Sequence, residues 1–158
     1  MSIRLRKRHG DFEKHDCDES HAMATIGMMN AEEFRLTAEK ALNVLPDRFR
    51  LAMENVVVVT EEFADDDVLR KMHVDSPYDL LGLYEGVSLI ERSTSDSGAL
   101  PDMIYLYRRP ILAVCRDSGQ SPDQCIAEVL MHEIGHYFGF SDAEMARIEQ
   151  LTGHHNVE

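Results

Sequence analysis

The chain has 158 residues, a length that fits one domain and leaves little room for two. Hydrophobic residues make up 44% of it and charged residues 28%, values that exclude a collagen-like or largely disordered chain. Asp and Glu number 29 against 16 Lys and Arg, and the resulting formal charge of −13 would repel a phosphate backbone. We therefore expect a globular protein that does not bind nucleic acid.

Targeting signals are not evident in the sequence. No apolar run approaches the ~20 residues of a membrane-spanning helix, and the basic residues of 1–10 are followed by acids instead of an apolar segment. Cys17, Cys115 and Cys125 are an odd number without CxxC spacing, so neither a disulfide framework nor a cysteine zinc site is indicated. We expect a cytoplasmic protein with no membrane partner, and its oligomeric state is open.

Periodic patterns begin only after the first 28 residues. Residues 1–28 alternate bases and acids without a helix or strand period, which predicts a flexible, charged tail, and 29–158 are expected to form a single domain. Asn30 followed by Glu33 has the spacing of a capping box, so a helix is predicted from there to Leu45.

The middle of the chain contains short strand and helix signals. The β-branched run Val56–Val59 predicts a central strand, and Val87–Glu91 and Met103–Tyr107 predict an antiparallel pair of strands. Helical segments are expected over residues 46–53, 68–72 and 110–118, and the glycines at 82 and 86 suggest a strand with a tight bend.

The final third has the clearest helix boundaries. Ser121–Gln124 combines a serine cap, a proline in the first turn and a glutamine three residues after the cap, so a helix is predicted from there to Phe138, ending at Gly139. Ser141 followed by Glu144 has the spacing of another capping box and predicts a last amphipathic helix.

The first of these two helices contains the motif HExxHxxGxxD, made by His132, Glu133, His136, Gly139 and Asp142. The histidines are four positions apart, so they lie about 40° apart on the helical wheel and both imidazoles can reach one ion. In a sequence of this composition, an HExxH match arises by chance with a probability of roughly a few per cent. The added glycine and aspartate lower this probability to about 10⁻⁴. The other face of the helix is predicted to be apolar through Ile126, Ala127, Leu130, Met131, Ile134, Tyr137 and Phe138.

Each position of the motif has a chemical role in a catalytic zinc site. Neutral imidazoles suit Zn²⁺, and a catalytic site takes three protein ligands with a fourth place for water. A positive φ at Gly139 would reverse the chain and bring Asp142 back as the third ligand beside His132 and His136. Glu133 would then act as general base on the metal-activated water, whose attack on a carbonyl hydrolyses an amide. The ring nitrogens that face away from the metal should donate to a carbonyl or carboxylate.

The motif also carries a family resemblance. HExxH on a helix is the signature of zincin metalloproteases, and the ligand after the glycine resembles the metzincin arrangement, with aspartate in place of its third histidine. The segments LPDRFR, NVVVV, LLGLYEGVSLIERS, LPDMIYLYRRPI and HEIGHYFGFSDAEM are similar to the small bacterial minimal zincin family of metallopeptidases, over about residues 30–152. Met145, only three residues past Asp142, does not clearly occupy the metzincin Met-turn.

The resemblance implies an α+β fold in which the active-site helix packs on a short mixed sheet with flanking helices. It implies that His132, His136 and Asp142 bind one Zn²⁺ per chain, that Glu133 is the catalytic base, and that the substrate is a peptide or protein. The alternative is a non-catalytic zincin-like protein that binds metal or peptide and regulates a partner. A metal-dependent RNA hydrolase is disfavoured by the charge of −13 and by Glu133.

Two further groups have both a functional and a structural interpretation. Tyr105, Tyr107, Arg108 and Arg109 could supply an oxyanion donor or bind a substrate carboxylate, or they could be ordinary residues of a strand and its end. Residues 83–91 could be an edge strand that holds an extended peptide by main-chain pairing, or an interior strand.

Overall fold

A computed structural model describes residues 29–92 and 100–153. The predicted tail over 1–28 lies outside the described residues. In chain order the elements are α2 (Ala31–Asn43), α3 (Asp47–Ala52), β1 (Val56–Glu61), α4 (Asp66–Lys71), the 3-10 turn η1 (Pro77–Asp79), β2 (Gly82–Glu85), β3 (Asp102–Tyr107), α5 (Arg108–Ser118), α6 (Pro122–Tyr137) and α7 (Asp142–Gly153).

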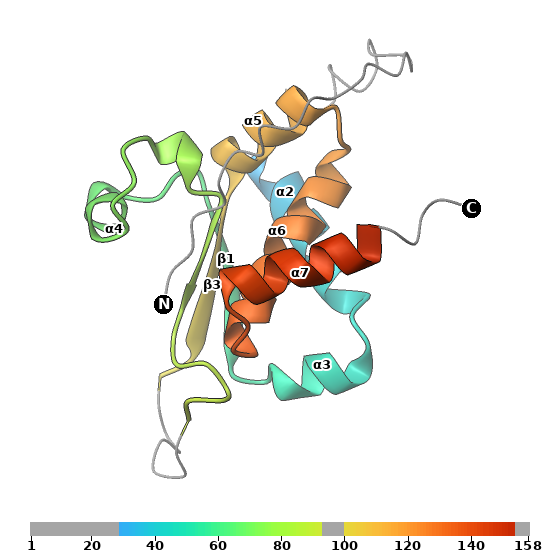
Figure 1. Ribbon diagram of the computed structural model, residues 1–158. Coiled ribbons are helices and arrows are strands. Elements are labelled where there is room, and N and C mark those ends of the chain that lie inside the picture. The colour runs from blue at the N-terminus through green and yellow to red at the C-terminus, as the bar shows by residue number, and fades with distance from the viewer. Residues whose placement is uncertain (1–28, 93–99, 154–158) are drawn as a thin grey trace.

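A three-stranded mixed sheet forms the centre of the fold. Its strand order is β1-β3-β2, with β1 parallel and β2 antiparallel to β3. Figure 1 shows α2, α5 and α6 gathered on one side of the sheet and α4 on the other. These elements confirm the expected α+β fold, and none of the described helices is long and apolar enough to cross a membrane.

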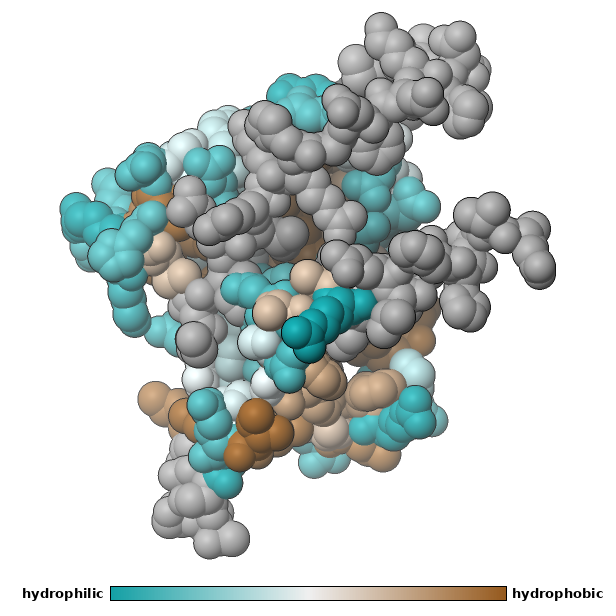
Figure 2. Space-filling model, viewed as in Figure 1, coloured by the Kyte–Doolittle hydropathy of each residue, from teal (hydrophilic) through white to brown (hydrophobic). Residues whose placement is uncertain are grey.

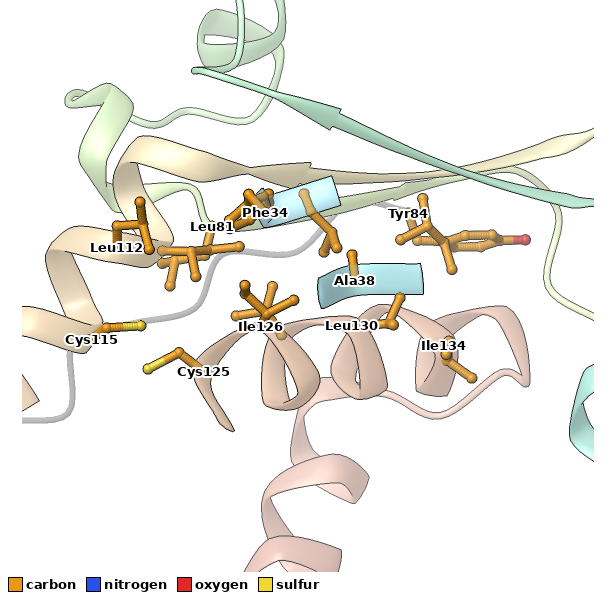
Figure 3. Packing of buried hydrophobic residues seen from close by; sticks show 14 of the residues in the cluster. Phe34, Ala38, Leu81, Tyr84, Leu112, Cys115, Cys125, Ile126, Leu130 and Ile134 are labelled. Carbon is orange, nitrogen blue, oxygen red and sulfur yellow. The ribbon is translucent and has the colours of Figure 1, made fainter. Parts of the chain in front are cut away.

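Apolar side chains fill both faces of the sheet. Ile104 and Leu106 of β3 are fully buried in one cluster with residues of α2 and α6, whereas Leu83 and Tyr107 belong to a second cluster beside α4. Figure 3 shows Ala38 of α2 and Leu130 of α6 in the first cluster. The alternation along β3 follows from the two-residue period of a strand, because successive side chains point to opposite faces. The sheet is therefore buried on both sides at its central strand.

Local capping signals set the helix boundaries near the predicted positions. The capping box of Asn30 and Glu33 is present, although α2 ends at Asn43, two residues before Leu45. The helix α5 ends where Gly119 adopts φ +70°, and α6 is capped by Ser121, whose hydroxyl accepts from the backbone N–H of Gln124. The apolar face predicted for α6 is wrong at Met131, which is 45% exposed.

The prediction that Val56–Val59 forms a central strand is wrong. In the sheet β1 is an edge strand, and β3 lies in the centre. Val56 and Val58 pack against the core, whereas Val57 is 43% exposed. A run of four valines satisfies β propensity on both faces, so it could not distinguish an edge strand with one covered face from a central one.

The prediction that Val87–Glu91 pairs with β3 is also wrong. The antiparallel partner of β3 is β2, the preceding segment, and 87–91 are irregular and end in a turn over 89–91. A side chain at Gly86 would collide with the carboxylate of Asp102. The strand therefore ends where the backbone of Gly86 lies close to that carboxylate. The N–H of Leu89 then donates to the carbonyl of Tyr137 at 2.9 Å, which directs this segment towards the end of α6.

Candidate metal centre

The helix α6 places its two histidines one turn apart near its C-terminal end. Both side chains are nearly buried, with His132 8% and His136 7% exposed. Their ring centroids are 4.8 Å apart, as expected for positions i and i+4 on one face of a helix. The two imidazoles therefore share one small volume.

A glycine turn brings the third predicted ligand to the same place. Gly139 has φ +95°, and the turn is closed by hydrogen bonds from its N–H to the carbonyl of His136 (2.9 Å) and from the N–H of Phe140 to the carbonyl of Gly135 (3.0 Å). Asp142 is the first residue of α7. The chain reversal predicted at Gly139 is thus present, and it returns Asp142 towards the histidines.

The three side chains converge on a common point. Asp142 Oδ1 is 3.3 Å from His132 Nε2 and 3.6 Å from His136 Nε2, and the possible ligand atoms all lie within 4.8 Å of one another. Ligands at about 2.1 Å in a tetrahedral zinc site are separated by about 3.4 Å. His136 Nε2 is buried and has no hydrogen-bond partner in the described part of the chain. The donor set and its spacing therefore fit one Zn²⁺.

The surroundings of His136 favour the neutral imidazole that binds metal. Burial lowers the pKa of His136, and the neighbouring His132 lowers it further, whereas Asp142 and the backbone of Phe140 act in the opposite direction. The hydrogen bond to the Phe140 backbone is of the kind that fixes the tautomer and orientation of a ligating histidine.

Glu133 is the most unusual side chain of the site, because it is an acid with no exposed surface. Burial raises its pKa to about 8, the backbone of Tyr84 lowers it, and Asp142 raises it. Neither of its carboxylate oxygens has a hydrogen-bond partner of good geometry among the described residues. A buried carboxylate left in this way is costly for folding and is typical of a functional group.

The strand β2 forms the wall against which Glu133 packs. A Cβ atom added at Gly82 would lie 2.8 Å from Glu133 Oε1 and 3.0 Å from Val129 Cγ1, so only glycine allows this approach. No motif in the sequence predicts that Gly82 belongs to the site. Its only signal was a glycine at the start of a strand, which often marks close approach of another group.

A second close approach joins α7 to the motif. Gly135 lies between the two histidines in sequence, and the thioether of Met145 packs against it. A side chain at Gly135 would collide with Met145. This glycine is one of the two variable positions in HExxH, so the motif itself does not require it. Its small size allows α7 to pack closely on α6 and so helps to position Asp142.

The arginines considered as oxyanion donors have structural partners. Arg108 Nε and Nη2 donate to the carboxylate of Glu62, both at 2.7 Å, and its Nη1 donates to the carbonyl of Met29 at 2.6 Å. Arg109 Nε donates to Glu62 at 3.0 Å. These contacts tie the start of α5 to the end of β1, and Tyr107 is buried in the cluster beside α4. Both arginines are therefore engaged in ion pairs with Glu62.

The fold and the site together define a class of protein. A helix with two histidines one turn apart, a buried glutamate beside the first, and an aspartate returned by a glycine turn is the arrangement of zincin-like proteins. The family model of the zincin-like metallopeptidases matches residues 53–151, which is more than half of the chain. The protein therefore belongs to the zincin-like metallopeptidase family. No curated protein matches the sequence.

Proposed function

We propose that the protein is a zinc-dependent peptidase that hydrolyses peptide bonds with Glu133 as general base. The observation that carries this proposal is the pairing of a convergent ligand set with a fully buried carboxylate next to it. A purely structural zinc site is closed by four protein ligands. Here three groups converge among the described residues, and neither carboxylate oxygen of the acid beside them has a hydrogen-bond partner of good geometry there.

In this proposal His132, His136 and Asp142 hold the ion. Zn²⁺ bound there would supply Lewis acidity, which lowers the pKa of a water molecule and polarises a carbonyl. The two imidazoles supply neutral nitrogen ligands, and Asp142 supplies the one negative charge. The hydrogen bond between His136 and the Phe140 backbone keeps the ring in its orientation.

Glu133 moves the proton in the proposed reaction. Its carboxylate takes a proton from the attacking water and passes it to the amine nitrogen that leaves. Burial brings its pKa near neutrality, where a group can both accept and release a proton at working pH. Gly82 acts as a positioning residue, because its lack of a side chain lets the carboxylate lie against β2.

We also propose that the substrate is an extended peptide held along β2. This strand pairs with β3 on one side only, so its other edge is open within the described part of the chain. Peptides bind such edges by adding a strand. Exposed apolar side chains continue from it towards the Gly139 turn, where Ile90 is 74% exposed and lies against Gly139. Figure 2 shows hydrophobic residues gathered over the lower half of the visible face.

The test compares the zinc-loaded parent with Glu133→Gln on a broad peptide library. The substitution keeps the size of the side chain and removes its basicity. We expect both proteins to bind about one zinc per chain, and we expect Glu133→Gln to cleave at least about 10²-fold more slowly. A parent that cleaves nothing above the Glu133→Gln background would contradict the proposal, and peptides bound equally by both would favour a regulatory, non-catalytic protein.

Two histidine variants serve as matched controls for metal binding. His136→Ala removes a ligand and is expected to weaken zinc binding by more than ~100-fold. His73 is exposed, has φ +53° and lies outside the convergent group, and asparagine tolerates that backbone conformation. His73→Asn should bind zinc as the parent does.

A further inference from the structure

A pair of buried thiols lies outside the metal centre and has no part in the proposed hydrolysis. Cys115 belongs to α5 and is 0% exposed, and Cys125 belongs to α6 and is 4% exposed. Both are free cysteines. Figure 3 shows their sulfur atoms pointing towards one another between the two helices.

The thiols interact with each other and with the turn that joins α5 to α6. Their mutual hydrogen bond raises the pKa of Cys115 and lowers that of Cys125. Cys125 Sγ donates to Gln120 Oε1 at 3.7 Å, and the Ser118 hydroxyl donates to the same oxygen at 3.1 Å. Both thiols belong to the main apolar core, and Cys125 also has a polar contact on the side of this turn, unlike a cysteine that only fills apolar space.

The turn that carries Ser118 and Gln120 reaches the surface. Ser118 and Gln120 are half-buried, and Gly119 between them is exposed, with no atom within 4 Å of the position where its side chain would begin. A local opening of this turn would break the contact between Gln120 and Cys125 Sγ. Such small openings require much less free energy than global unfolding.

We propose that Cys115 and Cys125 form an oxidisable dithiol, which hydrogen peroxide converts into an internal disulfide between α5 and α6. In the first step the Cys125 thiolate attacks the peroxide, the O–O bond breaks, and the sulfur is oxidised to a sulfenic acid as hydroxide leaves. In the second step the Cys115 sulfur attacks the sulfenic acid, the S–S bond forms, and water leaves. The two thiols lose two electrons in total, and the peroxide is reduced to two molecules of water.

The disulfide would join α5 covalently to the first half of α6, the helix that carries the two histidines. It joins residues ten positions apart and closes the α5–α6 hairpin covalently. A crosslink of this kind restricts the unfolded chain. The oxidised protein should therefore have a thermal midpoint higher by about 5 °C or more than the reduced protein. This inference does not depend on the proposed peptidase activity.

The test uses the full chain with Cys17→Ser, which removes the third thiol. The protein is treated with hydrogen peroxide and analysed by intact mass and by peptide mapping without reductant. We expect a monomer that has lost two hydrogen atoms, a crosslinked peptide pair containing Cys115 and Cys125, and reversal of both by dithiothreitol. Zinc content, measured before and after oxidation, reports whether the fold is retained.

Single-cysteine variants complete the design. Cys115→Ala and Cys125→Ala, each in the Cys17→Ser background, should give no internal disulfide and no rise in thermal midpoint after peroxide. A trapping reagent for sulfenic acids should label Cys125 in the Cys115→Ala protein. The proposal is overturned if the Cys17→Ser protein keeps both thiols after peroxide, if it forms only intermolecular dimers, or if it gains oxygen atoms without forming the crosslink.

Discussion

The end of α6 and the strand β2 meet at Glu133, but they are specified in different ways. The end of α6 is determined by neighbouring residues, since Gly139 ends the helix and Ser141 starts the next one. The strand β2 and the turns after it are held by distant contacts. Arg92 forms an ion pair with Asp102, and Leu89 donates to the carbonyl of Tyr137.

This difference shows how the two parts contribute to the site. The locally determined part supplies the chemical groups, because both histidines, the glutamate and the aspartate lie within eleven residues of sequence. The part fixed by tertiary contacts supplies the wall that excludes water from Glu133 and raises its pKa. Variants that disturb one part while leaving the other intact separate these contributions.

The largest effect is expected from Gly82→Ala, which changes the wall alone. Its new methyl group would lie 2.8 Å from Glu133 Oε1, so either the carboxylate or the strand must move. We expect the free energy of unfolding to fall by about 1–3 kcal/mol and hydrolysis to fall by about 10²-fold, with zinc still bound. Glu85→Ala, at an exposed position of the same strand, is the control for denaturant titrations and rates. Full activity of Gly82→Ala would show that β2 does not position the base.

A smaller effect is expected from Gly139→Ala, which changes the locally determined part. The residue has φ +95°, and an added Cβ would lie 2.5 Å from Ile90 Cδ1. We expect a loss of about 2 kcal/mol in unfolding free energy together with weaker zinc binding, because Asp142 follows this turn.

Gly119→Ala is the matched control for this turn. Gly119 also has a positive φ, +70°, but nothing lies within 4 Å of its added Cβ. Its loss should be about 1 kcal/mol, with zinc affinity unchanged. Equal losses of stability and of zinc affinity in the two variants would mean that the contact with Ile90 and the return of Asp142 are unimportant.

The same contrast explains which features could be predicted from the sequence. The ends of α6, the reversal at Gly139 and the start of α7 follow from residues three or four positions apart, and these predictions are confirmed. The position of β1 at the edge of the sheet and the end of β2 at Gly86 depend on residues far away in sequence. The same is true of the packing of Gly82 on Glu133, which no local pattern specifies.

The smallest effect is expected at the junction of β1 and α5. Arg108 first, and then Arg109, lower the pKa of Glu62 from 4.5 to about 2 by donating hydrogen bonds to its carboxylate. A group whose pKa is lower in the folded state than in the unfolded state stabilises the protein at pH values above its pKa in the unfolded state. This stabilisation is lost as the pH falls towards its pKa in the folded state. Because the Glu62 side chain is 48% exposed, its contribution should be only about 1 kcal/mol.

Glu62→Gln measures this contribution directly. At neutral pH its free energy of unfolding should be lower than that of the parent, and the difference should shrink between pH 4.5 and about 2. Glu54→Gln, at an exposed position, should not differ from the parent. A difference that stays constant over this range would mean that the carboxylate charge is not what Arg108 and Arg109 stabilise.

The central claim is that His132, His136 and Asp142 bind one zinc ion while Glu133 stays outside the coordination shell as the base. A crystal structure of the zinc-loaded protein tests this most directly. We expect Nε2 of both histidines and a carboxylate oxygen of Asp142 at about 2.0–2.2 Å from the ion, with Glu133 against Gly82 and not coordinated. A structure in which Asp142 turns away from the ion, or in which Glu133 replaces it as the third ligand, would contradict the account.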